Sequence, residues 1–179
     1  DFNNPVALQV GGSEIGDLKK ATKIAIDYNY DEINLNVGCP SKAVQKGSFG
    51  ACLMRDKILV RNCMEALQND RIEATLKCRL GLGRDLNYEF FEEFIDEISK
   101  TGIKIIYVHA RNAILSGISP QGNRTIPPLS YDFVKRMLDV GGVAITPGID
   151  FDPINGKSKI RISYARSTPE ILNGICLLY

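Results

Sequence analysis

Apolar residues follow two different patterns along most of the chain. Short, nearly continuous apolar runs predict buried strands, because they are too short to form helices that are apolar on every side. Between these runs, apolar residues recur at helical spacing and predict amphipathic helices. The predicted strands are 6–10, 32–37, 72–80 and 103–109, and the predicted helices are 18–28, 56–68, 88–100 and 131–138.

Local signals mark the ends of some of these elements. Ser13 is placed to cap the first helix, and Gly102 is placed to end the third one. A loop that contains Gly47 and Gly50 is expected after the second strand, and a long polar loop is expected over 110–128.

The alternating order of strands and helices predicts a parallel sheet with right-handed crossovers. Both a (β/α)8 barrel and an open, doubly wound sheet fit this order. Polar residues near the strand C-termini favour the barrel, because active sites lie at that mouth and a buried strand otherwise avoids such residues. The predicted fold is therefore α/β, a partial TIM (β/α)8 barrel of about four β/α units. The seven residues expected to converge at its mouth are Gln9, Asn36, Cys39, Lys77, Arg79, His109 and Arg111.

Composition narrows the possible function classes. The longest apolar runs are far shorter than a membrane span, and the opening residues Asp-Phe-Asn-Asn lack the pattern of a signal peptide. The missing initiator Met suggests that further sequence precedes residue 1. Five cysteines without a CxxC motif, together with the single His109, argue against a disulfide framework and a metal site. We therefore expect a cytoplasmic protein with reduced thiols, no metal and no membrane partner.

Charge is informative locally, although the net charge of +1 is not. Residues 39–62 carry five basic side chains and only Asp56 as an acid, whereas residues 85–97 carry six acids and no base. Two interpretations are open: the charges lie on solvated helix faces, or they form a basic rim and an acidic back around a site.

Several segments, in order along the chain, resemble the tRNA-dihydrouridine synthases. The most specific is Asn-Val-Gly-Cys-Pro at 36–40, and the loop at 115–129 is similar to the branch called synthase A. The other matching segments are Leu-Gln-Val-Gly-Gly at 8–12, Asp-Glu-Ile-Asn-Leu at 31–35, Gly-Ser-Phe-Gly-Ala-Cys-Leu-Met at 47–54, Leu-Lys-Cys-Arg-Leu-Gly at 76–81 and Val-His-Ala-Arg at 108–111.

This resemblance implies a TIM barrel that reduces uridine in tRNA with FMN, which NADPH recharges. It implies that Cys39 donates a proton to the uracil ring opposite the flavin, and a thiol is mostly protonated at neutral pH. Cys52, Cys63 and Cys78 lie in apolar or helical contexts and are expected to be structural. A dihydroorotate-type or old-yellow-enzyme-type barrel is the alternative, and the Asn-x-Gly-Cys-Pro segment argues against it.

The resemblance also implies contacts with the flavin. It assigns Gln9 to the flavin ring, Asn36 to the flavin and the target base, Lys77 to the flavin pyrimidine and His109 to the flavin. A cation beside the pyrimidine stabilises anionic reduced flavin. Asn34 shares a face with Asn36, so the choice between the two amides stays open.

Residues expected to contact tRNA come from two places. Arg79 and Arg111 share the strand faces of Lys77 and His109 and are expected to bind phosphate or position the substrate. The remaining candidates lie in the long loop that resembles the tRNA-contacting segment of the family. They are Gln121, Asn123 and Arg124.

The tail has a different character. Residues 141–153 and 159–171 resemble the C-terminal end of a PLP-dependent class I aminotransferase, in which Arg161 matches the arginine that binds the substrate carboxylate. Because the PLP lysine is absent, transaminase activity is not expected. The predicted division is a flavin-barrel segment at 1–138 and an aminotransferase-like segment at 139–179.

Alternatives remain for the tail and for the function. Residues 143–146 are an alternative fifth strand, Asn155-Gly156 is a turn signal for a hairpin, and 169–178 is a candidate helix. The glycine-rich phosphate site of the family is expected after about residue 140, where the resemblance ends. The alternative function is therefore a non-catalytic flavin- or RNA-binding remnant.

Overall fold

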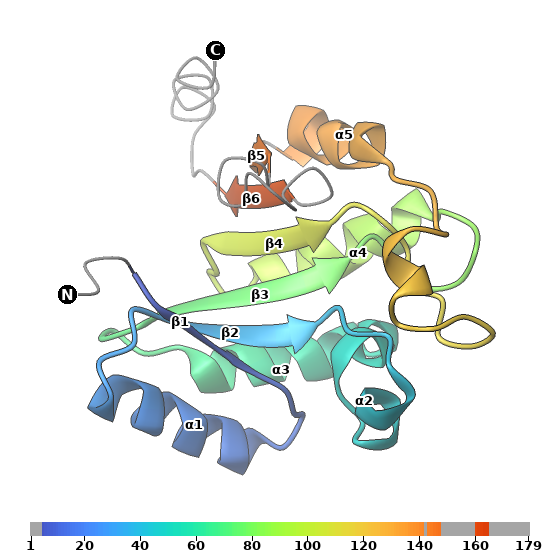
Figure 1. Ribbon diagram of the computed structural model, residues 1–179. Helices are drawn as coiled ribbons and strands as arrows, with labels where there is room; N and C mark the ends of the chain where they lie inside the picture. Colours follow the sequence, from blue (N-terminus) through green and yellow to red (C-terminus); the bar gives the residue numbers. More distant parts are fainter. Residues whose placement is uncertain (1–4, 142, 148–159, 165–179) are drawn as a thin grey trace.

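A computed structural model describes residues 5–141, 143–147 and 160–164 (Figure 1). It contains the predicted alternation of strands and helices, with ends that differ from the prediction by a few residues. The main elements are β1 (Ala7–Val10), α1 (Ile15–Asp27), β2 (Glu32–Val37), α3 (Lys57–Leu67), β3 (Glu73–Arg79), α4 (Tyr88–Ser99), β4 (Ile105–His109) and α5 (Tyr131–Gly141). The smaller ones are α2 (Lys42–Lys46), η1 (Gly50–Arg55), η2 (Gly122–Arg124), β5 (Val143–Pro147) and β6 (Ile160–Tyr164).

The first four strands settle the choice between the two architectures. They lie in the order β1-β2-β3-β4 and every neighbouring pair is parallel. The order never reverses, and α1, α3 and α4 cover the same face of the sheet (Figure 1). A doubly wound sheet places helices on both faces, whereas a barrel keeps them all outside. The predicted α/β partial barrel is confirmed.

The hydrophobic core lies between the sheet and these three helices. On the helix side, Leu35, Leu76 and Ile106 are fully buried. The apolar face of α4 supplies Phe91 and Phe94, which are also almost completely buried. This packing explains why the strands appear as nearly continuous apolar runs in the sequence.

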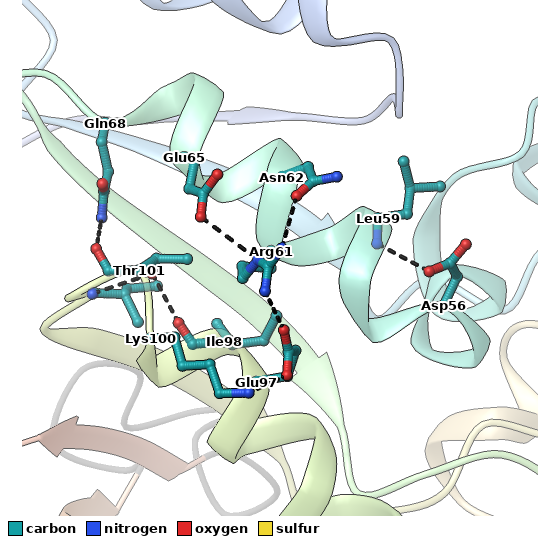
Figure 2. Close-up of polar contacts among 11 residues, drawn as sticks. Asp56, Leu59, Arg61, Asn62, Glu65, Gln68, Glu97, Ile98, Lys100 and Thr101 are labelled. Atoms are coloured by element: carbon teal, nitrogen blue, oxygen red, sulfur yellow. Dashed lines mark hydrogen bonds and ion pairs between the residues drawn. The ribbon is translucent and has the colours of Figure 1, made fainter.

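Ion pairs join α3 to α4 on the outside of the barrel segment, and Figure 2 shows the one between Arg61 and Glu97. The Nζ of Lys57 lies 2.6 Å from the Oε2 of Glu93, and the Nη1 of Arg61 lies 2.6 Å from the Oε1 of Glu97. Lys100 also contacts Glu97, at 2.5 Å. The acidic segment and part of the basic segment therefore neutralise each other, so neither of the two sequence-based interpretations describes this pair of helices fully.

Two local features differ from the predictions made from the sequence. Helix α1 begins at Ile15 after Glu14, and no side chain caps its first turn, so the prediction that Ser13 caps it is wrong. The expected loop after β2 instead folds into α2 and η1. The Oγ of Ser41 caps α2 by accepting a hydrogen bond from the N–H of Val44, at 3.3 Å. Because α2 buries none of its side chains, it leaves no apolar period in the sequence.

The tail contributes two described strands to the same sheet. Residues 143–147 form β5, so a fifth strand exists, but it pairs with β6 and not with β4. Strand β6 is antiparallel to both of its neighbours. The predicted turn at Asn155-Gly156 and the predicted helix at 169–178 lie outside the described residues. Across the described ranges, the helices are too short or too polar to cross a membrane.

Candidate active site

The face of the sheet opposite the helices is polar. Because side chains alternate across a strand, the residues between the buried apolar ones point to this second face. The register brings Asn36 beside Lys77 and Arg79 beside His109, at the C-terminal ends of β2, β3 and β4. The expected convergence of polar residues at the mouth is therefore present for the strand residues.

Cys39 lies in a tightly held turn after β2. The Oδ1 of Asn36 accepts hydrogen bonds from the N–H groups of Gly38 and Cys39, both at 3.1 Å. The carbonyl of Cys39 accepts from the N–H of Ala51 at 2.9 Å. The thiol is half-buried, and its Sγ lies 3.6 Å from the Oγ of Ser41. The turn thus fixes the backbone of Cys39 and leaves its side chain partly accessible.

Gly50 makes this turn possible. Its φ of +72° lies in the left-handed region, which favours glycine. A Cβ at this position would lie 2.6 Å from the carbonyl oxygen of Cys39 and 2.3 Å from a methyl group of Val44. Glycine is therefore required both for the backbone conformation and for the close approach of two chain segments.

Phe49 connects the Cys39 turn to β1. A Cβ at Gly11 would lie 2.7 Å from the Phe49 ring, and a Cβ at Gly47 would lie 2.4 Å from it. The ring is therefore packed between two glycine backbones, one in the loop after β1 and one after α2. This contact explains why both loops carry glycine at these positions.

The two neighbouring asparagines have different roles in the structure. Asn34 is buried at 4% exposure, accepts from Gln9 and donates to Thr75, both at 2.7 Å. Asn36 is nearer the mouth, is only half-buried, and holds the Cys39 turn. The geometry therefore favours Asn36 over Asn34 for ligand contact, and Asn34 for support of the site.

His109 is an incompletely satisfied group inside a cationic cluster. Its Nε2 is buried and has no hydrogen-bond partner among the residues that the structure describes. Burial, together with the nearby charges of Arg79, Arg111, Lys77 and Arg124, lowers the pKa of His109 to about 3. A neutral imidazole surrounded by four cations is suited to an electron-rich ligand that satisfies Nε2.

Arg79 connects three loops from inside the protein. It is 4% exposed, its Nε donates to the carbonyl of Gly38 at 3.2 Å, and its Nη1 donates to the carbonyls of Asn112 at 3.3 Å and Asn123 at 2.8 Å. Burial lowers its pKa to about 10, and the neighbouring Arg111 contributes to this shift. Its contact with tRNA stays a prediction, while its observed contacts position the Cys39 turn.

Arg111 donates hydrogen bonds to backbone carbonyls of the long loop. The Nη1 of Arg111 donates to the carbonyls of Thr125, at 3.3 Å, and Pro127. Asn123 is 1% exposed. Its Oδ1 accepts a hydrogen bond from the N–H of Ile114 at 2.7 Å, and its Nδ2 donates to the carbonyl of Ile114 at 2.9 Å. Within this loop Asn123 therefore has a structural role that the sequence did not indicate.

Gln121 and Arg124 are the exposed members of the same loop. They lie at the start and the end of η2, the short turn held by Asn123. Contact of either side chain with tRNA stays a prediction, and their exposure is compatible with it.

A separate cavity of about 740 Å³ lies at the opposite end of the sheet. Its lining includes Asp31, Arg71, Glu73 and Lys104, at or near the N-terminal ends of β2, β3 and β4. Cys39, Lys77 and His109 do not line it. In barrel enzymes the chemistry takes place at the C-terminal face, so this cavity is not the candidate active site. In the described part of the chain, no three His, Cys, Asp or Glu residues form a group that could hold a metal ion.

Comparison with known proteins identifies the group to which this arrangement belongs. Residues 1–143 match the protein family described as dihydrouridine synthase (Dus). The chain belongs to the dihydrouridine synthase family. The sequence-based identification of the family is thereby confirmed, whereas the resemblance of the tail to an aminotransferase, with Arg161 and a boundary at residue 138, stays a prediction.

Individual members of the dihydrouridine synthase family are closely similar to the chain. A tRNA-dihydrouridine(20/20a) synthase of Xylella fastidiosa is 54% identical over 135 residues, which cover 74% of this chain and 41% of that protein. Proteins of the same name from Xanthomonas axonopodis pv. citri and Synechocystis sp. are 45% and 44% identical, over 82% and 77% of this chain. These matches cover 47% and 44% of the two relatives. The chain thus spans less than half the length of these relatives.

Proposed function

We propose that this chain carries the catalytic turn and part of the flavin site of an enzyme that reduces uridine to dihydrouridine in tRNA, with FMN as cofactor and NADPH as reductant. The observation that carries the proposal is the position of Cys39, whose half-buried thiol lies on a fixed turn beside the polar mouth of the sheet. Membership of the family and the names of the relatives support it.

The residues at the mouth fit a flavin ring. The buried Nε2 of His109 has no partner among the described residues, and an electron-rich heteroatom of the flavin would satisfy it. Lys77 lies on the adjacent strand, and a cation there would favour the anionic reduced flavin. Gln9 and Asn36 offer amide groups at the ends of the neighbouring strands, and these would hold the polar edge of the ring.

Cys39 supplies the proton in this proposal. When bound, reduced FMN supplies a hydride to one carbon of the uracil C5=C6 bond. The thiol of Cys39 transfers its proton to the other carbon, the double bond becomes a single bond, and solvent restores the proton on sulfur. Arg79 donates to the carbonyl of Gly38 at 3.2 Å and so helps to hold the turn that presents the thiol.

Two further features support the setting of this reaction. The four described cysteines are unpaired, which supports the cytoplasmic location that we propose. Gln121 and Arg124 are exposed on the loop beside the mouth, and we propose that they contact tRNA.

The first test is flavin binding by the chain. The chain is mixed with FMN and passed over a sizing column, and flavin absorbance should co-elute with the protein. It is then incubated with NADPH and unmodified tRNA, and dihydrouridine is measured by mass spectrometry of the digested nucleosides. Binding of FMN without formation of dihydrouridine would mean that the chain is a flavin-binding module without catalytic activity. Absence of both would contradict the proposal for this chain.

The second test separates binding from chemistry. Replacement Cys39→Ala should leave FMN binding unchanged and lower the rate of dihydrouridine formation about 100-fold or more, because only the proton donor is lost. The matched control is Cys52→Ala, a second half-buried cysteine whose Sγ contacts the carbonyl of Phe49 at 3.1 Å. A Cys39→Ala variant that retains the parental rate would exclude Cys39 as the acid.

A further inference from the structure

A continuous line of hydrogen bonds crosses the polar face from Glu32 to the Cys39 turn. The Thr75 hydroxyl donates to the Glu32 carboxylate at 2.5 Å and accepts from the Asn34 amide at 2.7 Å. Asn34 accepts in turn from Gln9 at 2.7 Å, and Gln9 accepts from Asn36 at 3.4 Å. Asn36 accepts from the backbone N–H of Cys39 at 3.1 Å. We call this line of groups the polar chain.

The two ends of the polar chain fix its direction. An ionised carboxylate only accepts hydrogen bonds, so Thr75 must donate to Glu32 and is left to accept from Asn34. At the other end a backbone N–H only donates, so the oxygen of Asn36 must face Cys39. Working inward from either end gives the same orientation for all three amides. Every side chain between the ends can donate and accept, so none of them sets the direction by itself.

We propose that Glu32 is a positioning residue that orders the Cys39 turn through this polar chain. Reversal of any one amide would place two donors or two acceptors against each other at two points, which is costly on a partly buried surface. Asn34 and Thr75 are buried at 4% and 0% exposure, so water does not readily replace their partners. Tyr107 donates to the second oxygen of Glu32 at 3.0 Å and holds the carboxylate in place.

The fixed direction has a consequence for the mouth of the site. The side-chain oxygens of Gln9 and Asn36 both accept bonds within the polar chain, while each amide nitrogen carries a second hydrogen. Glu32 and the backbone N–H groups of Gly38 and Cys39 together therefore make the two amides hydrogen-bond donors toward any ligand at the mouth, which suits ring carbonyl oxygens. The relevance of this to catalysis rests on the proposed function, but the coupling of Glu32 to Cys39 does not.

The test is the rate at which iodoacetamide alkylates Cys39 in the chain without flavin, measured by peptide mass spectrometry. Thr75→Val interrupts the polar chain. Glu32→Gln replaces the end that only accepts hydrogen bonds with an amide that can also donate, so only the Cys39 end still fixes the direction. Each should raise the alkylation rate of Cys39 roughly threefold to tenfold, as expected when one ordering hydrogen bond is lost. Cys52, on the same segment but outside the polar chain, is the internal reference and should keep its rate.

Two further variants separate this coupling from general loosening. Thr75→Ser retains the hydroxyl and should restore the parental rate of Cys39. Glu73→Gln is the matched control, because Glu73 pairs with Glu32 in the sheet register but lies outside the polar chain. Unchanged alkylation of Cys39 in Glu32→Gln, or an equal rise at Cys39 and Cys52, would overturn the proposal. Glu32 is partly exposed, so its variant provides the test if Thr75→Val does not fold.

Discussion

The two faces of the four parallel strands do different work with alternating residues of the same segments. On β2, Ile33, Leu35 and Val37 are fully buried against the helices, while Asn34 and Asn36 belong to the opposite, polar face. The apolar face stabilises the fold by removing surface from water. The polar face gains little net stability from its hydrogen bonds but fixes the orientation of each group. Consecutive residues of one strand thus serve different purposes, one stabilising the fold and the next positioning groups of the site.

The largest expected effect is on the apolar face. Leu35→Ala should lower the free energy of unfolding by about 2–5 kcal/mol, because it leaves a cavity among packed side chains. Urea denaturation followed by circular dichroism measures this loss. Leu86→Ala is the control at a partly exposed leucine and should cost much less. Equal losses for both variants would mean that the helix-facing side is not the core.

The next effect concerns the backbone under Cys39. Gly50→Ala should cost about 1–3 kcal/mol, because it adds left-handed strain to a clash with the carbonyl of Cys39. The same denaturation experiment measures it. Gly83→Ala is a matched control, since Gly83 has a φ of +90° but open space around its Cβ position. If the two variants lose the same stability, the close approach to Cys39 contributes nothing beyond backbone strain.

A pH effect should come from the polar face. The folded-state pKa of His109 is about 3, below the usual value of 6.5, so the unfolded chain binds a proton more readily than the folded one. Its contribution to stability is therefore full above pH 6.5 and is lost as the pH falls from 6.5 toward 3. Unfolding measured across this range should show a weaker pH dependence in His109→Gln. An unchanged pH dependence would indicate that other groups cause it.

The smallest effect is expected outside both faces. Lys57→Ala removes an exposed ion pair between α3 and α4 and should cost no more than about 1 kcal/mol. Arg61→Ala should cost more, because Arg61 contacts the carboxylate of Glu97, whose side chain is only 11% exposed. Thermal unfolding at low and high salt distinguishes the two, since salt screens the exposed pair more strongly. An equal and salt-independent cost would contradict this ranking.

The sequence predicted the apolar face more fully than the polar one. Leu35 and Ile106 lie in runs whose period and length indicate strands directly, and the polar strand ends indicated the mouth. The ordering of Asn34 and Asn36 was not predictable, because both have the same parity on β2 and only contacts across strands distinguish them. Glu32, Thr75 and Tyr107 were missed for the same reason, although an acid at the first position of a buried strand was a usable signal.

The loops show the same limit more clearly. Asn123 resembled an RNA-contacting residue, yet its side-chain amide makes two hydrogen bonds with the backbone of Ile114. No local sequence pattern indicates these hydrogen bonds. Arg79 was expected to face a ligand because it shares a strand face with Lys77. Its actual partners are carbonyls from loops that are distant in sequence, so only tertiary structure reveals them.

The packing of Phe49 between Gly11 and Gly47 has a consequence for the order of folding. The site for the ring consists of backbone from two loops on either side of α1 and β2, so it exists only after β1 has paired with β2. Such a non-local contact forms late, when the entropy of closing the intervening segment has already been overcome. The turn that carries Cys39 should therefore be among the last parts to become ordered. Accordingly, Phe49→Leu should accelerate unfolding while leaving the folding rate nearly unchanged.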